Sequence, residues 1–253
     1  MSDAVQTPRV AVVTGAGSGI GRATALRFVR GGCHVLAVGR RAEPLLETAE
    51  LAGGAEQVTV AALDIAEVGA MDEAVSQLVA ARGCVDALVA NAGVNPQRAD
   101  ALETTDEAWD ETLRINLTGL HRSCRAVLPH MIAQKHGAIV ATGSVSGQVG
   151  MAERAAYGPT KAGVIQYARN LAIDYAKHGV RANSINPAFV VTDMTRDWLE
   201  SRPAGVLDQI VAAHPLGLGT PEDVANAAWF LSTGESRWIT GVDLSVDGGF
   251  SAH

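Results

Sequence analysis

Short runs of apolar and β-branched residues alternate with longer segments of helical periodicity along most of the chain, and no other feature constrains the fold as strongly. This alternation is typical of parallel strands joined by helices. The runs are apolar at nearly every position, which indicates strands that are buried on both faces. We therefore predict an α/β fold with a seven-stranded parallel sheet and helices on both faces. The predicted strands are Val10–Thr14, His34–Val38, Gln57–Leu63, Val85–Ala90, Ala138–Gly143, Val180–Asn186 and Val242–Val246.

The segments between these strands are predicted to be helices, and one stretch is irregular. No Ser/Gly linker, block of charge or internal repeat divides the chain, so we expect a single domain over residues 1–253. The longest irregular stretch, residues 187–220, is expected to form a lid over a binding site, with a small packed helical excursion as the alternative. The predicted helices are Ile20–Arg30, Pro44–Leu51, Met71–Arg82, Glu107–Gln134, Tyr157–Lys177 and Pro221–Leu231.

Charge and cysteine content exclude several classes of function. The chain has 20 Lys and Arg against 27 Asp and Glu, and the net charge of −7 repels nucleic acid and anionic membrane surfaces. Cys33, Cys84 and Cys124 include no C-x-x-C, so we expect buried thiols, with neither a disulfide framework nor a metal site. Met1–Pro8 lacks the basic and apolar regions of a signal peptide, and no apolar run is long enough to span a membrane. We therefore expect a cytoplasmic protein.

A glycine-rich turn joins the first predicted strand to the first predicted helix. Gly15, Gly19 and Gly21 have no Cβ, so the backbone can turn sharply and approach a pyrophosphate, with the N–H groups of the helix start facing the anion. The spacing is G-x-x-x-G-x-G, which differs from the G-x-G-x-x-G of many dinucleotide-binding folds. A turn without a ligand is the alternative, so this motif is interpreted together with the motifs further along the chain.

The second predicted strand ends where a dinucleotide-binding fold normally offers an acidic residue to the adenosine ribose. That acid is absent, and the strand runs into Gly39, Arg40 and Arg41. A planar guanidinium suits a 2′-phosphate, so we predict NADP as the preferred cofactor, with NAD as the alternative. A solvated strand end is the other interpretation of both arginines.

Three residues in the second half of the chain form a candidate catalytic set. Tyr157 and Lys161 are four residues apart and therefore share one face of a helix, and Pro159 between them fits only its first turn. The ammonium is expected to lower the pKa of the phenol from about 10, which would make a usable general acid/base. Ser144 follows the predicted strand Ala138–Gly143, at the end of the sheet where open α/β folds bind ligands.

These motifs together resemble those of the short-chain dehydrogenase/reductase family, in its short single-domain branch, and the likeness extends from Val10 to Gly249. The resemblance implies a Rossmann-type doubly wound fold, a homotetramer, and hydride transfer between a nicotinamide cofactor and a carbonyl or secondary alcohol. The motifs are Thr14-Gly15-x-x-x-Gly19-x-Gly21, Leu63-Asp64-Ile65, Asn91-Ala92-Gly93, Ile115-Asn116, Ser144, Tyr157-x-x-x-Lys161, Asn186-Pro187 and Val246-Asp247-Gly248-Gly249.

The same resemblance implies a role for each motif residue. Ser144 would bond the substrate oxygen, Tyr157 would transfer the proton, and Lys161 would also bind the nicotinamide ribose. Asn116 would hold the water of a proton relay. The residues expected to bind the cofactor are Gly15, Ser18, Gly19, Ile20, Gly21, Arg40, Asp64, Ile65, Asn91, Gly93, Tyr157, Lys161, Val190 and Thr192, with Asp64 and Ile65 at the adenine and Val190 and Thr192 at the carboxamide.

The substrate is left open by these motifs. The family's Pro-Gly after the sixth strand is Pro187-Ala188 here, a departure that bears on the position of the nicotinamide. A 3-oxoacyl thioester, a sugar or polyol, a steroid and a specialised-metabolite ketone all fit a pocket of mixed apolar and charged residues. Substrate contacts are expected from Ser144, Gln148, Arg154 and Trp198, with further lining from Val145, Met151, Glu153, Phe189 and Met194.

Two other functions fit parts of the pattern. A regulatory or scaffold protein that binds the cofactor without turnover would usually lack Tyr157, Lys161 or Ser144, and all three are present. A serine hydrolase built on Ser144 needs G-x-S-x-G, and this chain has Thr142 and Ser146 in place of the two glycines. We therefore predict an NAD(P)-dependent oxidoreductase that acts on a small carbonyl or alcohol.

Overall fold

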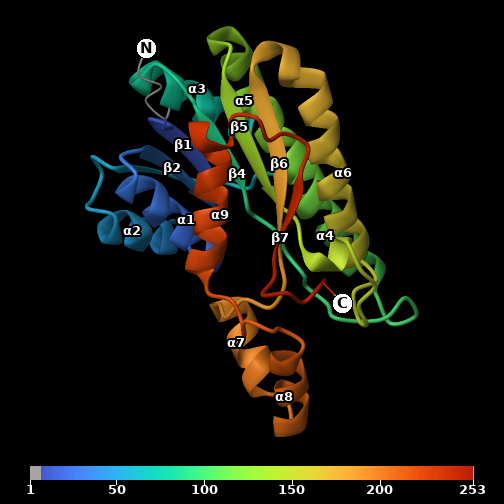
Figure 1. Ribbon diagram of the computed structural model, residues 1–253. Coiled ribbons are helices and arrows are strands. Elements are labelled where there is room, and N and C mark those ends of the chain that lie inside the picture. Colours follow the sequence, from blue (N-terminus) through green and yellow to red (C-terminus); the bar gives the residue numbers. More distant parts are fainter. Residues whose placement is uncertain (1–6, 253) are drawn as a thin grey trace.

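A sheet of parallel strands forms the centre of the molecule, with the order β3-β2-β1-β4-β5-β6-β7 (Figure 1). The computed structural model describes residues 7–252, except the side chains of Asp193, Met194, Asp197, Glu200 and Ala204. The predicted fold class is confirmed, and every strand boundary lies within two residues of its prediction. The strands are β1 (Val10–Thr14), β2 (His34–Gly39), β3 (Val58–Ala62), β4 (Ala87–Ala90), β5 (Gly137–Thr142), β6 (Val180–Pro187) and β7 (Asp243–Val246).

Helices cover both faces of this sheet (Figure 1). The helices α1, α2 and α9 pack on one face, and α3, α5 and α6 pack on the other. Within residues 7–252, no helix combines the length and the apolar character needed to cross a bilayer. The helices are α1 (Gly19–Arg30), α2 (Ala42–Leu51), α3 (Ala70–Arg82), α4 (Asp106–Leu113), α5 (Leu120–Gln134), α6 (Tyr157–Tyr175), α7 (Asp193–Glu200), α8 (Ala204–Ala212) and α9 (Pro221–Ser232).

Two hydrophobic cores result, because consecutive residues of a strand point to opposite faces of a sheet. Val12 and Leu88 are fully buried in the core that contains residues of α3, α5 and α6. Val13 and Val89, their neighbours in sequence, are fully buried in the core that contains residues of α1, α2 and α9. The nearly continuous apolar character of the strands therefore reflects burial on both sides, as predicted.

The order of the strands also creates a place for a ligand. β1 lies between β2 and β4, so the chain builds the sheet outward from β1 in two directions. At such a reversal the loops at the carboxyl ends of the strands diverge and leave a crevice, and open α/β sheets bind ligands there. The turns after β1, β4 and β5 all lie at this end of the sheet.

Two segments differ from the sequence prediction. The single helix predicted over Glu107–Gln134 is divided into α4 and α5 by a π-helical turn, Arg114–Gly119. Such wide turns often mark functional positions, and this one contains Asn116. Residues 187–220 contain α7 and α8, which extend beyond the carboxyl end of the sheet (Figure 1), so this stretch includes the helical excursion that was the alternative to an irregular segment.

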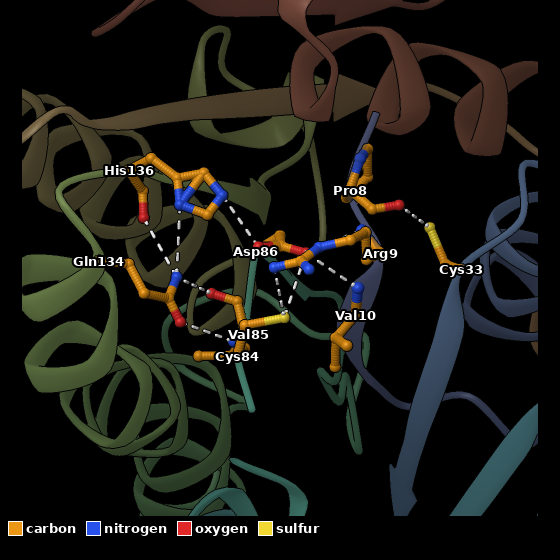
Figure 2. Close-up of polar contacts among 9 residues, drawn as sticks. All are labelled: Pro8, Arg9, Val10, Cys33, Cys84, Val85, Asp86, Gln134 and His136. Atoms are coloured by element: carbon orange, nitrogen blue, oxygen red, sulfur yellow. Dashed lines mark hydrogen bonds and ion pairs between the residues drawn. The ribbon is translucent and has the colours of Figure 1, made fainter. Parts of the chain in front are cut away.

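The opposite, amino-terminal edge of the sheet is held by a buried carboxylate (Figure 2). Asp86, 5% exposed, accepts hydrogen bonds on Oδ2 from the backbone N–H of Arg9 at 2.7 Å and of Val10 at 3.1 Å. Its Oδ1 lies 2.9 Å from Nε2 of His136. A cavity of about 440 Å³ lies at this edge, lined in part by Asp86 and Trp238, and it is remote from the predicted catalytic residues.

The three cysteines are buried and form no disulfide, as predicted. Cys33 Sγ donates to the carbonyl oxygen of Pro8 at 2.9 Å (Figure 2), and burial raises the pKa of this thiol to about 12. Burial also raises the pKa of Cys124 to about 12. Thiols of such high pKa are protonated at neutral pH, so these cysteines serve packing rather than nucleophilic chemistry.

Candidate active site

The glycine-rich turn leaves β1 and leads directly into α1. Gly15 and Gly19 have φ angles of +70° and +50°, a left-handed backbone that favours glycine. A Cβ on Gly21 would collide with the carbonyl oxygen of Gly15, so only glycine lets the helix begin this close to the turn. The turn is tied to the end of β4, because Thr14 Oγ1 accepts from the Asn91 N–H at 3.1 Å and Asn91 Nδ2 donates to the Thr14 carbonyl at 3.2 Å.

A cavity of about 150 Å³ opens beside this turn. Its wall includes Gly39, which has no side chain to fill the space, and both Arg40 and Arg41. Six of the predicted cofactor residues line it, namely Gly15, Ser18, Arg40, Asp64, Ile65 and Gly93. The backbone N–H groups of the first turn of α1, which contains the predicted residues Gly19, Ile20 and Gly21, suit a phosphate group. These features fit a phosphorylated dinucleotide.

Charged side chains surround the far end of this cavity. Arg40 is 59% exposed and its Nη1 lies 3.7 Å from Glu111 Oε1, a weak surface ion pair that leaves the guanidinium able to turn toward a phosphate. Asp64 accepts from Arg114 Nη1 at 2.8 Å and from the Ala66 N–H at 2.8 Å. Burial alone would raise the pKa of Asp64, but these hydrogen bonds outweigh it and lower the pKa. The carboxylate therefore stays charged.

The predicted catalytic side chains meet where β5 gives way to α6. Ser144 follows the end of β5, and its Oγ accepts from the Ser146 N–H at 3.1 Å. Tyr157 is the first residue of α6, as predicted, and Lys161 follows one turn later. The Lys161 ammonium is buried, lies 5.5 Å from the centre of the Tyr157 ring, and donates to the Thr142 carbonyl at 2.7 Å.

Burial controls the acidity of this set. It raises the pKa of Tyr157, although a hydrogen bond with Ser144 and the charges of Arg154 and Arg98 act the other way. Burial also lowers the pKa of Lys161 to about 8. The expectation that the ammonium lowers the pKa of the phenol does not hold here, because Lys161 points to a backbone carbonyl and desolvation dominates.

Asn116 joins the loop after β4 to α6. Its Oδ1 accepts from the Val94 N–H at 2.8 Å, while Nδ2 donates to the Val94 carbonyl and to Thr160 Oγ1, each at 3.0 Å. The side chain is therefore fully engaged in positioning Val94 and Thr160, and it is buried.

A second cavity of the site, of about 90 Å³, lies against the predicted catalytic side chains. Ser144 and Tyr157 contribute to its wall. Of the residues predicted to contact or line the substrate site, Arg154, Val145, Met151 and Phe189 also line it. Residues that the sequence analysis missed are Asn95, Arg98, Ser146, Ala188 and Thr195. No local motif marks them, because they come from three separate loops and the start of α7.

Other predicted substrate residues lie elsewhere. Gln148 does not line this cavity, because its side chain binds β7: Nε2 donates to Asp243 at 3.4 Å and Oε1 accepts from Ser245 at 3.1 Å. Glu153 is exposed to solvent. Trp198 stacks on Phe189 with 5.6 Å between ring centres, so it lies behind the wall and not in it. The predicted contact of Met194 falls on a side chain outside the described residues.

The two residues predicted at the carboxamide lie where β6 ends. Val190 pairs with Gly219 in an isolated parallel bridge, which anchors the backbone after β6. Thr192 approaches the glycine-rich turn, since a Cβ on Gly19 would lie 3.2 Å from its Cγ2. Thr195 Oγ1 donates to the Val190 carbonyl and accepts from the Thr192 N–H at 2.9 Å, which orders the start of α7.

Comparisons with known proteins agree with this geometry. A family model described as enoyl-(acyl carrier protein) reductase matches residues 15–251. The chain is 38% identical over 249 residues to the 2-(R)-hydroxypropyl-CoM dehydrogenase of Xanthobacter autotrophicus, covering 96% of this chain and 99% of the relative.

Two solved structures extend the likeness to three dimensions. One is an oxidoreductase of the short-chain dehydrogenase/reductase family from Burkholderia thailandensis, with 40% identity, a TM-score of 0.88, and coverage of 98% of this chain and 94% of that one. The other is a gluconate 5-dehydrogenase from Burkholderia cenocepacia in complex with NADP and tartrate, with 30% identity, a TM-score of 0.90, and coverage of 97% and 96%.

Three findings lead to one assignment. The glycine turn lies at a crevice of a parallel sheet, the cavity beside it suits a dinucleotide, and nearly the whole chain is similar to known dehydrogenases and reductases. NADP is bound in structures that share this fold, which indicates an NAD(P) cofactor. This protein is an NAD(P)-dependent oxidoreductase and belongs to the short-chain dehydrogenase/reductase family.

Proposed function

We propose that this protein transfers hydride between NADP(H) and the carbonyl or secondary alcohol carbon of a small molecule, with Tyr157 as the general acid/base. One observation carries the proposal. Tyr157 and Ser144 line the substrate cavity, and a Cβ on Gly93, which lines the cofactor cavity, would lie 3.3 Å from Lys161 Nζ. The Lys161 ammonium thus lies near Tyr157, which lines the substrate cavity, and near Gly93, which lines the cofactor cavity.

The side chains then have complementary tasks in the reduction. NADPH, when bound, supplies the hydride that adds to the carbonyl carbon. The hydroxyls of Ser144 and Tyr157 donate to the carbonyl oxygen, which stabilises the negative charge that develops there. Tyr157 delivers its proton to that oxygen, and Lys161 stabilises the phenolate that is left. The raised pKa of Tyr157 keeps the phenol protonated at neutral pH, which is the form needed to reduce a carbonyl.

NADP is the cofactor that we propose as preferred over NAD. Arg40 and Arg41 line the cofactor cavity beside Gly39, and the weak ion pair of Arg40 leaves a guanidinium for a 2′-phosphate. Among the predicted cofactor residues, Val190 and Thr192 would hold the carboxamide. The Asn116 side chain is occupied by Val94 and Thr160, so any water of a proton relay would bind its backbone.

The segment 187–220 is proposed to act as a lid within a single domain spanning the chain. Support comes from Phe189 and Thr195, which belong to this segment and line the substrate cavity. Because α7 and α8 extend past the sheet, movement of these helices would open the cavity without disturbing either core (Figure 1).

A pair of tyrosine variants tests the proposal. NADPH oxidation is measured with a panel of ketones, and the reverse reaction with the matching alcohols. Tyr157→Phe should reduce kcat by about 100-fold or more while NADPH affinity, measured by fluorescence titration, stays nearly unchanged. Tyr167→Phe is the matched control, because this phenol lies on the same helix but bonds His121 at 2.9 Å. A Tyr157→Phe enzyme that retains more than about a tenth of its activity would overturn the assignment.

A further inference from the structure

Two arginines face the substrate cavity beside the reacting groups. Arg98, from the loop between β4 and α4, and Arg154, from the loop before α6, line the cavity together with Tyr157 and Ser144. The proposed function assigns no task to either of them. Both guanidinium groups lie close enough to Tyr157 for their charges to lower the pKa of its phenol.

Arg98 has a hydrogen-bonding group with nothing to bind. Its Nη1 is buried and has no hydrogen-bond partner among the described residues. A buried donor without an acceptor destabilises the fold, and more so when the group is charged. The guanidinium packs over an aromatic ring, since Cζ lies 4.0 Å from the centre of the Trp198 ring. The group is therefore fixed in orientation and available to an acceptor.

Asn95, which lines the same cavity, also has a buried polar atom without a hydrogen-bond partner among the described residues. Its Oδ1 is also buried without a hydrogen-bond partner among residues 7–252, and the residue lines the cavity beside Arg98. The oxygen and nitrogen of a carboxamide exchange places by a simple rotation, so the same side chain can present N–H donors to the cavity.

The described wall of this cavity has no carboxylate to pair with the arginines. None of the described residues lining the cavity is acidic. Burial lowers the pKa of Arg98 to about 10, and the charge of Arg154 acts in the same direction. Burial lowers the pKa of Arg154 as well, and the charge of Glu153, an exposed residue outside this wall, acts the other way on both arginines.

Other arginines of this chain are paired differently. Arg114 lies 2.8 Å from Asp64 and 2.7 Å from Glu111. Arg22 lies 2.6 Å from Glu47. Although acidic residues outnumber basic ones in this chain, Arg98 and Arg154 lie together beside Tyr157. The described residues that line the substrate cavity include no carboxylate.

We propose that Arg98 and Arg154 bind an oxyanion carried by the substrate, a carboxylate or a phosphate, so that the physiological substrate is an anionic ketone or secondary alcohol. The inference rests on the proposed function and adds the substrate class. Two guanidinium groups can grip such an anion through paired N–H···O bonds, while Ser144 and Tyr157 hold the carbonyl. Because the cavity measures only about 90 Å³, the anion lies within a few bonds of the reacting carbon.

Matched ketones test this class of substrate. NADPH oxidation is compared for 4-oxopentanoate and its methyl ester, and for dihydroxyacetone phosphate and dihydroxyacetone. We expect kcat/KM to be about 10- to 100-fold higher for the anion in at least one pair, mainly through KM. The first pair reports a carboxylate and the second a phosphate. Equal kcat/KM within both pairs overturns the inference but leaves the proposed function intact.

Charge-removing variants assign the effect to the two arginines. Arg98→Gln and Arg154→Gln should each reduce the preference for the anion to about a tenth or less, whereas Arg98→Lys should retain part of it. Arg30→Gln is the matched control, because Arg30 is exposed at the end of α1. A preference that survives both glutamine variants contradicts the inference. If Arg98→Gln does not fold, Arg154→Gln and Arg98→Lys give the same comparison.

A binding measurement separates this inference from the proposed function. Calorimetric titration of the NADP complex with 4-oxopentanoate and dihydroxyacetone phosphate, and with the neutral partner of each, reports affinity without turnover. If an anion binds more tightly than its neutral partner and Arg154→Gln loses this difference, the inference is supported. It is supported even if no ketone is reduced, because absence of turnover counts only against the proposed function. Binding of neither anion above its neutral partner overturns the inference.

Discussion

Lys161 is held in the proposed catalytic site at a cost in stability, and replacing it with methionine should make the cofactor-free protein more stable. The side chain is 4% exposed, and burial lowers its pKa from 10.5 to about 8. A difference of this size corresponds to roughly 3 kcal/mol of destabilisation of the charged form in the folded state. Methionine has similar length and no charge, so Lys161→Met removes this penalty.

The net gain is smaller than the penalty. Lys161→Met also loses the hydrogen bond from Nζ to the Thr142 carbonyl at 2.7 Å, worth about 1–1.5 kcal/mol. We therefore expect the free energy of unfolding at pH 7 to rise by about 2 kcal/mol in the variant. The same substitution should abolish turnover, because the proposed partner of the phenolate is gone. A residue that improves function while destabilising the fold is typical of an active site.

The pH dependence gives the sharper test. The folded-state pKa of Lys161 lies below its unfolded value, so the penalty is complete below about pH 8 and fades as the pH rises toward 10.5, where the unfolded chain also loses the proton. The wild-type protein should therefore gain stability relative to Lys161→Met between pH 8 and about pH 10. The advantage of the variant at pH 7 should shrink to nothing or reverse at about pH 10.

Urea unfolding followed by circular dichroism, without cofactor and at one protein concentration, measures both differences. Lys177→Met is the control, because Lys177 is exposed and its replacement should change stability little at either pH. A Lys161→Met variant that is less stable than the wild type at about pH 7 would contradict the predicted burial penalty. A difference between the two proteins that is the same at both pH values would also contradict it.

The remaining predictions concern the cofactor and the assembly. Gly21→Ala should weaken NADP binding by at least about tenfold in fluorescence titration, because its Cβ would collide with the carbonyl of Gly15 and open the turn; unchanged affinity would contradict the role of the turn. Gly39→Asp combined with Arg40→Leu should lower the ratio of kcat/KM for NADP over NAD by about tenfold; a wild-type enzyme that already favours NAD would show that the phosphate site is misassigned. A homotetramer is expected, in keeping with a Trp238 side chain that is 91% exposed, and a light-scattering mass of one 26.2 kDa chain with full activity would refute it.

The sequence by itself determined the features that depend on near neighbours. Apolar runs that alternate with helical segments predicted all seven strands, because burial on both faces makes a strand apolar at nearly every position. The glycine turn at Gly15 to Gly21 was predictable, since left-handed backbone and close approach require glycine wherever they occur. Tyr157 and Lys161 fall on one helix face because their spacing is that of a helical turn.

Tertiary structure decided the features that depend on residues far apart in the chain. Arg98 and Arg154 come from different loops and meet only because β4 and β5 are neighbours in the sheet. Gln148 was predicted to contact substrate, yet β7 supplies Asp243 and Ser245, and the side chain binds them instead. Such contacts leave no periodic trace in the sequence.

Acidity was also outside the reach of the sequence. The spacing of Tyr157 and Lys161 predicted a lowered pKa for the phenol, whereas the structure raises it. A pKa depends on how much water and which charges surround a group, and both are set by the whole packed molecule. The residue types of the site and their order are therefore local information, while their charge states and the partners of their side chains exist only once the chain has folded.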